Sequence, residues 1–282
     1  LTPYLAGTHF VFDRKAFADT DTILSTNWDL DDEDLRAVLR LPYRLASGRP
    51  DKMFIIIEEF QNLDMTEDGE KIFKMMEQVM DEMRAAGVRN FSYIFLGSMV
   101  NAMADIFVRR HFFYRRVEHL KLSKVDERII VEHIIKGFLA SGKVIDRDLI
   151  SGACRLFKCN LFYINHFTSI CDALSKGYIM EPVLLEALET ILAINRGRFV
   201  SMVSDLTNFQ VSLLQAIIDG YTKFSTAEVI RKYSLNSSAN VRRLKDALMK
   251  KEIITFVGEE ERPVLPDPLF EYWLKNYYVK KN

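Results

Sequence analysis

Two short runs of consecutive apolar residues flank an amphipathic stretch in the N-terminal half of the chain. Residues 53–57 and 91–96 are rich in β-branched and aromatic side chains, and such runs are typical of strands buried on both faces of a parallel sheet. From Glu70 to Ala86 apolar residues recur with a helical period, and Gly87 stands where a helix C-terminal cap is expected. The pattern predicts a strand–helix–strand unit with parallel neighbouring strands and a right-handed crossover.

Weaker patterns predict further elements around this unit. The segment from Thr8 to Phe12 predicts another strand, and the acidic block 29–34 predicts a helix start, because carboxylates suit the positive end of a helix dipole. Met99 to Phe107 predicts a helix, and the alternation from Val117 to Leu122 predicts a strand near the edge of the sheet. The first 122 residues are therefore expected to form an α/β domain.

From Ser123 to Asn195 the pattern of apolar positions is helical throughout. Ser123 with Asp126 marks the start of the first predicted helix, and the break at Arg196-Gly197 marks the end of the last. The other helices are expected at 146–157, 161–175 and 181–195. We interpret residues 123–205 as a helical subdomain.

The last segment, residues 206–282, has the pattern of a winged helix, with a helix-turn-helix followed by a hairpin. Its longer helix, from Ser238, exposes a set that could contact a nucleic-acid groove. The set is Asn240, Arg242, Arg243, Lys245, Lys250 and Lys251. The predicted wing tip, Glu259-Glu260-Glu261, would repel phosphate. A protein partner is therefore favoured for this module, and DNA is the alternative.

The composition is that of an ordinary globular protein with little net charge. The chain has 282 residues, 49% of them hydrophobic and 27% charged, and its net charge is −1. This balance makes no case for nucleic acid or membrane as the partner of the whole molecule, and no apolar run reaches the ~18 residues needed to cross a bilayer. The three cysteines lack Cys-x-x-Cys spacing, which predicts reduced thiols. A cytoplasmic protein is expected.

Polar residues follow both predicted strands at the ends where ligands bind in open α/β sheets. Glu58 and Glu59 follow the first strand, and Gly97 and Ser98 follow the second. A rigid strand that ends in two carboxylates can bring one to the shell of a magnesium ion and the next to an attacking water. The alternative is a core strand whose next turn is acidic because it meets solvent.

The stretch Phe54-Ile55-Ile56-Ile57-Glu58-Glu59-Phe60-Gln61 resembles the Walker B segment of the archaeal-type ATPase family, a branch of the AAA+ and STAND-like P-loop NTPases. Glu58 replaces the more usual Asp. Gly97-Ser98 is similar to the sensor-1 segment of that family, and Arg116 falls where an arginine commonly precedes the next strand. The segment from Asp267-Pro268-Leu269 to Trp273 is similar to the pattern that ends the winged helix of the same family.

The resemblance implies cofactors and residue roles as well as a fold. ATP and Mg²⁺ are the expected ligands, and the helical subdomain is expected to act as a lid over the nucleotide. Glu58 would bind Mg²⁺ and support the bound cofactor. Glu59 would polarise the attacking water, Ser98 would sense the phosphate, and Arg116 would supply positive charge, so that these three are the expected catalytic residues.

One segment, Gly137 to Val144, matches the G-x-x-x-x-G-K part of a phosphate-binding loop but does not fit the context. A helix is predicted before it, where such a loop needs a strand, and Val144 fills the position of the magnesium-binding Ser or Thr. No other Gly-Lys-Ser/Thr combination occurs in the 282 residues. In the resembled family the loop lies before the region of residues 8–13. Because the chain starts at Leu1 and not at a Met, we expect a trimmed protein, and the loop is cut off, unobserved or lost.

The sequence thus predicts a helix-rich α/β fold in three parts. These are a partial P-loop NTPase parallel sheet at 1–122, a helical lid at 123–205 and a winged helix at 206–282. The leading hypothesis is an ATP-binding, ATP-hydrolysing switch that is inactive as these 282 residues because they lack the phosphate loop. The alternative is a non-enzymatic scaffold or a DNA-binding regulator that keeps the fold without nucleotide chemistry.

Overall fold

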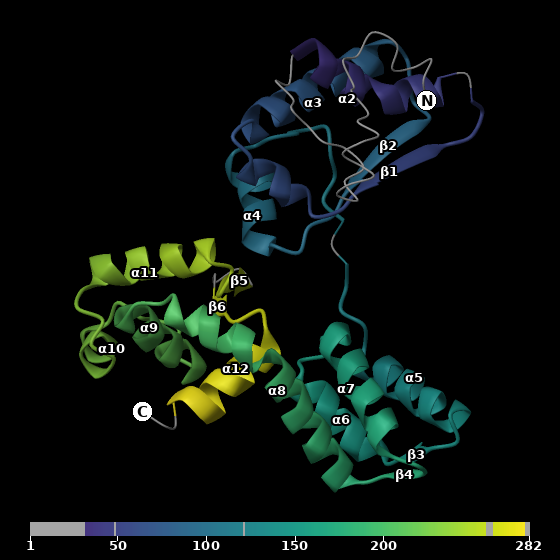
Figure 1. Ribbon diagram of the computed structural model, residues 1–282. Helices are drawn as coiled ribbons and strands as arrows, with labels where there is room; N and C mark the ends of the chain where they lie inside the picture. Colours follow the sequence, from purple (N-terminus) through teal and green to yellow (C-terminus); the bar gives the residue numbers. More distant parts are fainter. Residues whose placement is uncertain (1–31, 48, 121, 258–261, 280–282) are drawn as a thin grey trace, which may run out of the picture. The chain divides into compact units, whose positions relative to one another are not determined.

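The chain forms two compact units, residues 1–119 and residues 120–282, each with its own hydrophobic core (Figure 1). The computed structural model describes residues 32–47, 49–120, 122–257 and 262–279. The predicted strand at 8–12 and the predicted wing tip at 259–261 lie outside the described residues. The division between the units falls near the predicted boundary at 122, and the three-domain division itself stays a prediction.

The first unit is built around the predicted strand–helix–strand arrangement. Strands β1 (Met53–Ile57) and β2 (Phe91–Phe95) are parallel and pair residue by residue along their whole length. Helix α3 (Gly69–Ala85) connects them, and Gly87 follows it with a φ of 80°, a left-handed conformation that suits glycine at a helix end. The predicted parallel pair and its connecting helix are confirmed.

Helix α2 (Asp32–Ala46) precedes β1 and packs against α3. Its first turn carries three acidic residues, as the charge pattern predicts. Arg36 and Arg40 of α2 both bind the carboxylate of Glu82 on α3, with nitrogen–oxygen distances of 2.5 Å. These partly exposed ion pairs link the two helices and add modestly to their packing.

Short helical turns follow each strand. After β1 the chain makes a 3₁₀ turn, η2 (Phe60–Met65), and after β2 it forms α4 (Val100–Ala104). Helix α4 continues as a π-helical turn, η3 (Asp105–Arg109). Together α4 and η3 confirm the helix predicted at 99–107.

Aromatic rings fill the core of the first unit. The ring of Phe60 lies 4.3 Å from that of Phe95, 5.2 Å from that of Phe73 and 5.8 Å from that of Phe113, measured between centroids. Phe60, Phe73 and Phe113 are completely buried. Because Phe60 comes directly after Glu59, the burial of its ring fixes the turn that carries the two carboxylates.

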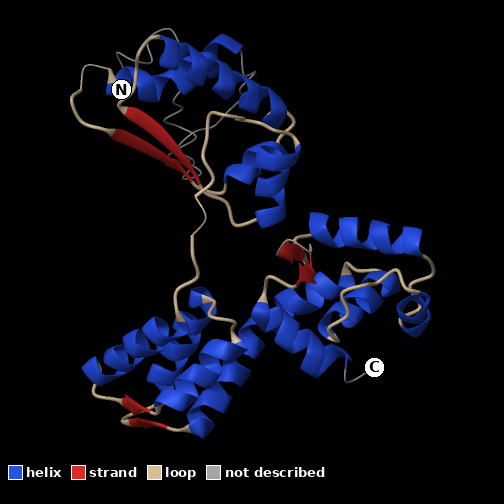
Figure 2. Ribbon diagram, turned by 180° about the vertical axis from the view of Figure 1, so that it is seen from behind, coloured by secondary structure: helices blue, strands red, loops and turns tan. Residues whose placement is uncertain are grey.

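Only one face of the β1–β2 pair is covered by the described helices (Figure 2). Tyr43 of α2 packs on Phe91, and the core ring of Phe60 packs on Phe95, so this face of β2 meets the helices. On the opposite face, Phe54 and Ile56 are each 57% exposed. The expectation of strands buried on both faces is therefore wrong for the described residues, because α2 and α3 both lie on the same side.

The strand predicted from Val117 to Leu122 does not form in the described residues. Residues 117–120 and 122 have no regular structure, and Leu120 and Leu122 are 82% and 90% exposed. Alternating polarity produces a strand only where a neighbouring strand satisfies the backbone hydrogen bonds, and β2 pairs with β1 alone in the part of the chain that is described. This segment instead connects the two units.

The second unit begins with four helices. These are α5 (Glu127–Ala140), α6 (Arg147–Leu156), α7 (Leu161–Leu174) and α8 (Glu181–Ser204). Asp126, Asp146 and Asn160 cap the first three by accepting hydrogen bonds from backbone N–H groups. The predicted helices are confirmed, although Asp126 and not Ser123 caps the first. Two short strands, β3 (Val144–Ile145) and β4 (Tyr178–Ile179), pair in parallel. They link the α5–α6 connection to the α7–α8 connection.

Helix α8 runs through Gly197, where the sequence predicts a break. Its last turns place Phe199 and Val203 in the core, where both are buried. A glycine inside a helix costs about 1 kcal/mol relative to alanine, whereas burying a Phe or a Val stabilises by about 1.5–3 kcal/mol. Tertiary burial outweighs the local preference, so the predicted end at Asn195 is wrong.

The C-terminal part has the predicted helix-turn-helix and hairpin. Its elements are α9 (Asn208–Ile218), α10 (Ala227–Lys232), α11 (Ser238–Lys250), the antiparallel strands β5 (Thr255–Val257) and β6 (Arg262–Val264), α12 (Pro268–Trp273) and the π-helical turn η4 (Leu274–Tyr278). Thr207 and Gln210 form a reciprocal capping box at the start of α9. The order and spacing of these elements confirm the predicted winged helix.

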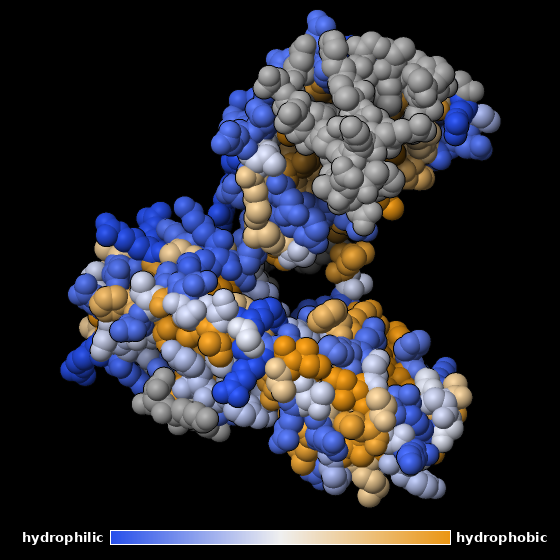
Figure 3. All heavy atoms as spheres, viewed as in Figure 1, coloured by the Kyte–Doolittle hydropathy of each residue, from blue (hydrophilic) through white to orange (hydrophobic). Residues whose placement is uncertain are grey.

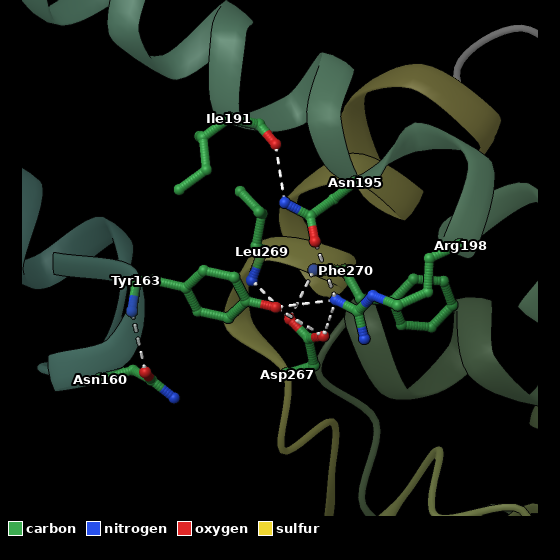
Figure 4. A network of polar contacts seen from close by, with 8 residues as sticks. All are labelled: Asn160, Tyr163, Ile191, Asn195, Arg198, Asp267, Leu269 and Phe270. Atoms are coloured by element: carbon green, nitrogen blue, oxygen red, sulfur yellow. Dashed lines mark hydrogen bonds and ion pairs between the residues drawn. The ribbon is translucent and has the colours of Figure 1, made fainter. Parts of the chain in front are cut away.

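A polar network joins the helical subdomain to the winged helix (Figure 4). Oδ1 of Asp267 caps α12 by accepting hydrogen bonds from the N–H groups of Leu269 and Phe270, at 3.0 and 2.9 Å. Its Oδ2 accepts from the hydroxyl of Tyr163 at 2.9 Å and from the guanidinium of Arg198 at 2.7 Å. One carboxylate therefore connects α7, α8 and α12.

Apolar contacts reinforce this junction. The ring of Phe199 on α8 lies 5.5 Å from that of Phe270 and 5.6 Å from that of Trp273, both on α12. Lys158 adds an ion pair to Glu271 at 2.5 Å. A single hydrophobic core extends from α5 to the start of η4, so the helical subdomain and the winged helix form one body.

We expect Asp267→Ala to lower the free energy of unfolding of the second unit by about 1–3 kcal/mol. A lost N-cap costs about 1 kcal/mol, and the lost hydrogen bonds to a charged group add to it, reduced by the partial exposure of Arg198. Asp267→Asn should lose less, because asparagine caps a helix equally well but carries no charge for Arg198. Urea denaturation followed by tryptophan fluorescence measures both variants, and equal stability of all three proteins would contradict the expectation.

Candidate functional site

Backbone hydrogen bonds tie the ends of β1 and β2 together. The N–H of Leu96 donates to the carbonyl of Ile57, and the N–H of Phe60 donates to the carbonyl of Leu96, both at 2.9 Å. Glu58 and Glu59, the two residues between, therefore form a turn beside the end of β2. Glu59 is left-handed, with φ 50° and ψ 44°, one of nine described non-glycine residues with a positive φ, so the conformation shapes this turn and does not by itself mark a functional site.

The structure brings Glu59 and Ser98 together. Oε2 of Glu59 accepts hydrogen bonds from Oγ of Ser98 at 2.6 Å and from the Ser98 N–H at 3.4 Å. The side-chain amide of Gln61 donates to the same oxygen at 2.5 Å. The Ser98 hydroxyl first, and the Gln61 amide second, lower the pKa of Glu59. The carboxylate is therefore held ionised, and its Oε1 has no hydrogen-bond partner among the described residues.

Gln61 belongs to this site although the sequence reasoning gave it no role of its own. Its side chain is 1% exposed, and its Oε1 has no hydrogen-bond partner in the described part of the chain. A Cβ added at Gly97 would lie 2.4 Å from that oxygen, so the amide packs directly against the glycine. The one sequence signal for Gln61 is its place in the Walker B-like stretch.

Glu58 is exposed at the end of β1, with no hydrogen-bond or ion-pair partner among the residues the structure describes. An exposed carboxylate at this place fits one ligand of Mg²⁺, whose shell is completed by waters and by the phosphates of a nucleotide. No group of three or more His, Cys, Asp or Glu side chains in the described ranges could hold a metal ion by itself. Glu58 therefore supplies a single carboxylate, and a metal ion bound there would need its other ligands from elsewhere.

Arg116 has its contacts elsewhere, on helix α3. Its guanidinium donates to Asp81 at 2.6 and 2.9 Å and to Glu77 at 3.0 Å. The hydrogen bond to Asp81 raises the pKa of Arg116 and lowers that of Asp81. Two carboxylates thus neutralise Arg116, and no contact within the described residues joins it to Glu59 or Ser98.

The segment from Gly137 to Val144 does not have the geometry of a phosphate-binding loop. Gly137 lies inside α5, and Lys143 pairs with Oδ1 of Asp172 on α7 at 2.8 Å, with its side chain only 14% exposed. The ion pair holds Lys143, which lies in the connection between α5 and α6, against helix α7 and not toward a ligand. The structure agrees with the exclusion of this segment as a phosphate loop.

Helix α11 offers a smaller basic surface than the sequence suggests, although its visible side is hydrophilic (Figure 3). Asn240 donates to the carbonyl of Leu235, and Lys251 donates to the carbonyl of Asp205. Lys245 is half-buried over two aromatic rings. Three cations of the predicted set stay exposed without a partner in the described structure: Arg242, Arg243 and Lys250.

Comparisons with known proteins agree with this architecture. Residues 197–276 match the family model described as a probable winged helix domain. The chain is similar to a solved structure, the Walker-type ATPase of Pyrococcus abyssi, with a TM-score of 0.64 and 18% sequence identity, over 93% of this chain and 74% of that chain. No curated protein matches the chain.

At this sequence identity the structural likeness shows the fold alone. The chain has the fold of a Walker-type ATPase with a C-terminal winged helix. The predicted fold class is therefore confirmed, and the resemblance to archaeal-type ATPases is confirmed at the level of the fold. In the part of the chain that the structure describes, no helix is long and apolar enough to span a bilayer.

We expect Arg116→Ala to destabilise the first unit by about 1–2 kcal/mol. Glu77 and Asp81 would lose their shared cation, and the magnitude lies between that of an exposed and a buried ion pair. Arg115→Ala is the matched control, because Arg115 contacts only the ring of Tyr114, at 5.2 Å, among the interactions described. Thermal unfolding followed by circular dichroism measures both, and an unchanged melting temperature in Arg116→Ala would show that the ion pairs contribute no stability.

Proposed function

We propose that this chain carries the hydrolytic part of an ATPase site and acts as an ATP-dependent switch. The observation that carries the proposal is the Glu59 carboxylate, held by Ser98 and Gln61 with one oxygen left open. It lies beyond the carboxyl end of a parallel strand, where open α/β sheets bind their ligands. The fold shared with a Walker-type ATPase supports the same proposal of an ATPase site.

Each residue of the candidate site would have a separate role in ATP hydrolysis. Glu59 would accept a hydrogen bond from the attacking water through Oε1 and polarise it, as a general base does. Ser98 would sense the γ-phosphate with the same hydroxyl that binds Glu59, so that nucleotide and carboxylate compete for one donor. Glu58 would hold Mg²⁺, which when bound neutralises charge that develops on the phosphates. Arg116 would add positive charge only after leaving its carboxylates on α3.

The phosphate-binding part of such a site is a loop with Gly-Lys-Ser/Thr, and the 282 residues do not contain one. Backbone N–H groups and a lysine of that loop position the β- and γ-phosphates. Without them Glu58 and Glu59 repel the nucleotide. We therefore expect the 282 residues alone to hydrolyse ATP negligibly, and the switch to operate in a form of the protein that supplies the loop.

The alternative function is that of a non-enzymatic scaffold or a DNA-binding regulator. The observation that favours it is the pair Arg242 and Arg243, exposed on α11 and without partners in the described structure. A winged helix can contact DNA through such a helix or bind a protein through the same surface. We favour a protein partner, because the chain is nearly neutral and lacks long-range attraction for phosphate.

In a form of the protein that contains the phosphate loop, we expect Glu59→Gln to keep ATP binding and to lose hydrolysis by about 100-fold or more. The amide keeps the shape but cannot accept a proton as a carboxylate does. Phosphate release measures turnover, and titration with a fluorescent nucleotide measures affinity. Asn62→Ala, exposed on the same turn, should keep the parent rate. Equal rates for the parent and Glu59→Gln would show that Glu59 has no catalytic role and is only a residue that follows strand β1.

We expect the 282-residue chain to bind random duplex DNA with a dissociation constant weaker than ~10⁻⁶ M at physiological salt, at or below the non-specific range. Arg242→Ala/Arg243→Ala should leave this weak binding unchanged. Fluorescence anisotropy at two salt concentrations measures both proteins. Tight binding that falls steeply with salt and disappears in the double variant would move the regulator function to first place.

A further inference from the structure

Three features meet where the turn after β1 lies against the end of β2. Glu59 has a left-handed backbone, Gln61 is buried with an unpartnered Oε1 among the described residues, and Gly97 leaves no space for a side chain. Buried polar atoms without a hydrogen-bond partner are rare in folded proteins, so the Gln61 oxygen needs an explanation. All three features lie at or beside the Glu59 carboxylate, so one explanation should account for them together.

The fold presents the amide nitrogen of Gln61 to Glu59. Phe60, buried against Phe95, anchors the turn, and its N–H donates to the carbonyl of Leu96. The next residue, Gln61, extends inward, and its Nε2 lies 2.5 Å from Oε2 of Glu59. The reverse orientation of the amide would set two acceptor oxygens against each other, so the chemistry of the pair fixes the nitrogen as the donor.

Gly97 lies directly against the Gln61 amide and leaves space for it. A Cβ at position 97 would lie 2.4 Å from Oε1 of Gln61 and 2.5 Å from Sδ of Met103. No real Cβ contact is that short, so a side chain at Gly97 would displace both the Gln61 amide and the Met103 side chain. The glycine therefore makes room for the amide that holds Glu59.

We propose that Gln61 is a positioning residue for Glu59, and that residue 97 is a glycine because the Gln61 amide occupies the adjacent space. The proposal deepens the proposed function and rests on it, since Gln61 acts on the attacking water only through Glu59. Ser98 and Gln61 donate to the same oxygen from two directions. Together they fix the carboxylate plane and leave Oε1 for the water.

A purely structural role does not explain the amide. Methionine has a similar length and volume, and it fills irregular gaps without an unpaired acceptor. A buried amide whose oxygen has no partner in the described structure is the less stable filling for the same space. The hydrogen bond from Nε2 to Glu59 is what distinguishes Gln61 from an apolar residue at this position.

The test compares the 282-residue chain with its Gln61→Met and Gly97→Ala variants. In Gln61→Met we expect an unchanged or higher melting temperature together with a more mobile Glu59 side chain. In Gly97→Ala the displaced amide should also release Glu59. Side-chain relaxation in NMR at constant pH gives the order parameter of Glu59, which should fall in both variants. Asn62→Met, the same substitution at an exposed neighbour, is the control and should leave Glu59 unchanged.

An unchanged order parameter of Glu59 in Gln61→Met would overturn the proposal, because Ser98 alone would then position the carboxylate. A lower melting temperature with unchanged order would assign Gln61 to packing and overturn it as well. Loss of order in Gln61→Met without loss in Gly97→Ala would refute the role of Gly97.

Kinetics in a form that contains the phosphate loop separate this proposal from the proposed function. Gln61→Met should lower kcat by about 10–100-fold and leave KM nearly unchanged. If the parent of that form hydrolyses no ATP while Glu59 loses order as expected in the 282-residue variants, the ATPase function fails and the positioning role of Gln61 stands.

Discussion

The candidate site depends on how the carboxyl ends of two parallel strands are joined. One carbonyl, that of Leu96, accepts the N–H of Phe60, while the N–H of Leu96 donates to Ile57. The turn between them has little freedom, because one end is paired in the sheet and the other is held by a buried ring. A shift of register by one residue would turn every side chain to the opposite face and separate Glu59 from Ser98.

Local patterns predicted most of the elements, for identifiable reasons. Helix α3 lies within one residue of its predicted bounds because its apolar stripe is regular and Gly87 ends it. The meeting of Glu59 and Ser98 was also predictable, since parallel strands end at the same edge of a sheet. Where long-range packing decides the outcome, local patterns failed. Gly197 did not end α8, and the alternating residues from Val117 found no strand to pair with in the described structure.

The partners of polar side chains were the least predictable part of the site. Arg116 resembles a phosphate contact in sequence, but its carboxylates come from a helix more than thirty residues earlier, as the 35-residue separation from Asp81 shows. The contact of Gln61 with Glu59 could not be predicted for the opposite reason. A polar residue in a motif is expected to face solvent, whereas the Gln61 amide is buried against Gly97, a residue thirty-six positions later that leaves room for it.

The junction around Asp267 changes what should be regarded as the C-terminal module. A protein cut at residue 206 would separate Asp267 from Arg198 and expose Phe270 and Trp273, which pack on Phe199. The match to the winged-helix family begins at residue 197, within α8. The last turns of α8 therefore pack as part of the winged helix, and a fragment meant to fold as this module has to begin inside a helix and not at the loop that follows it.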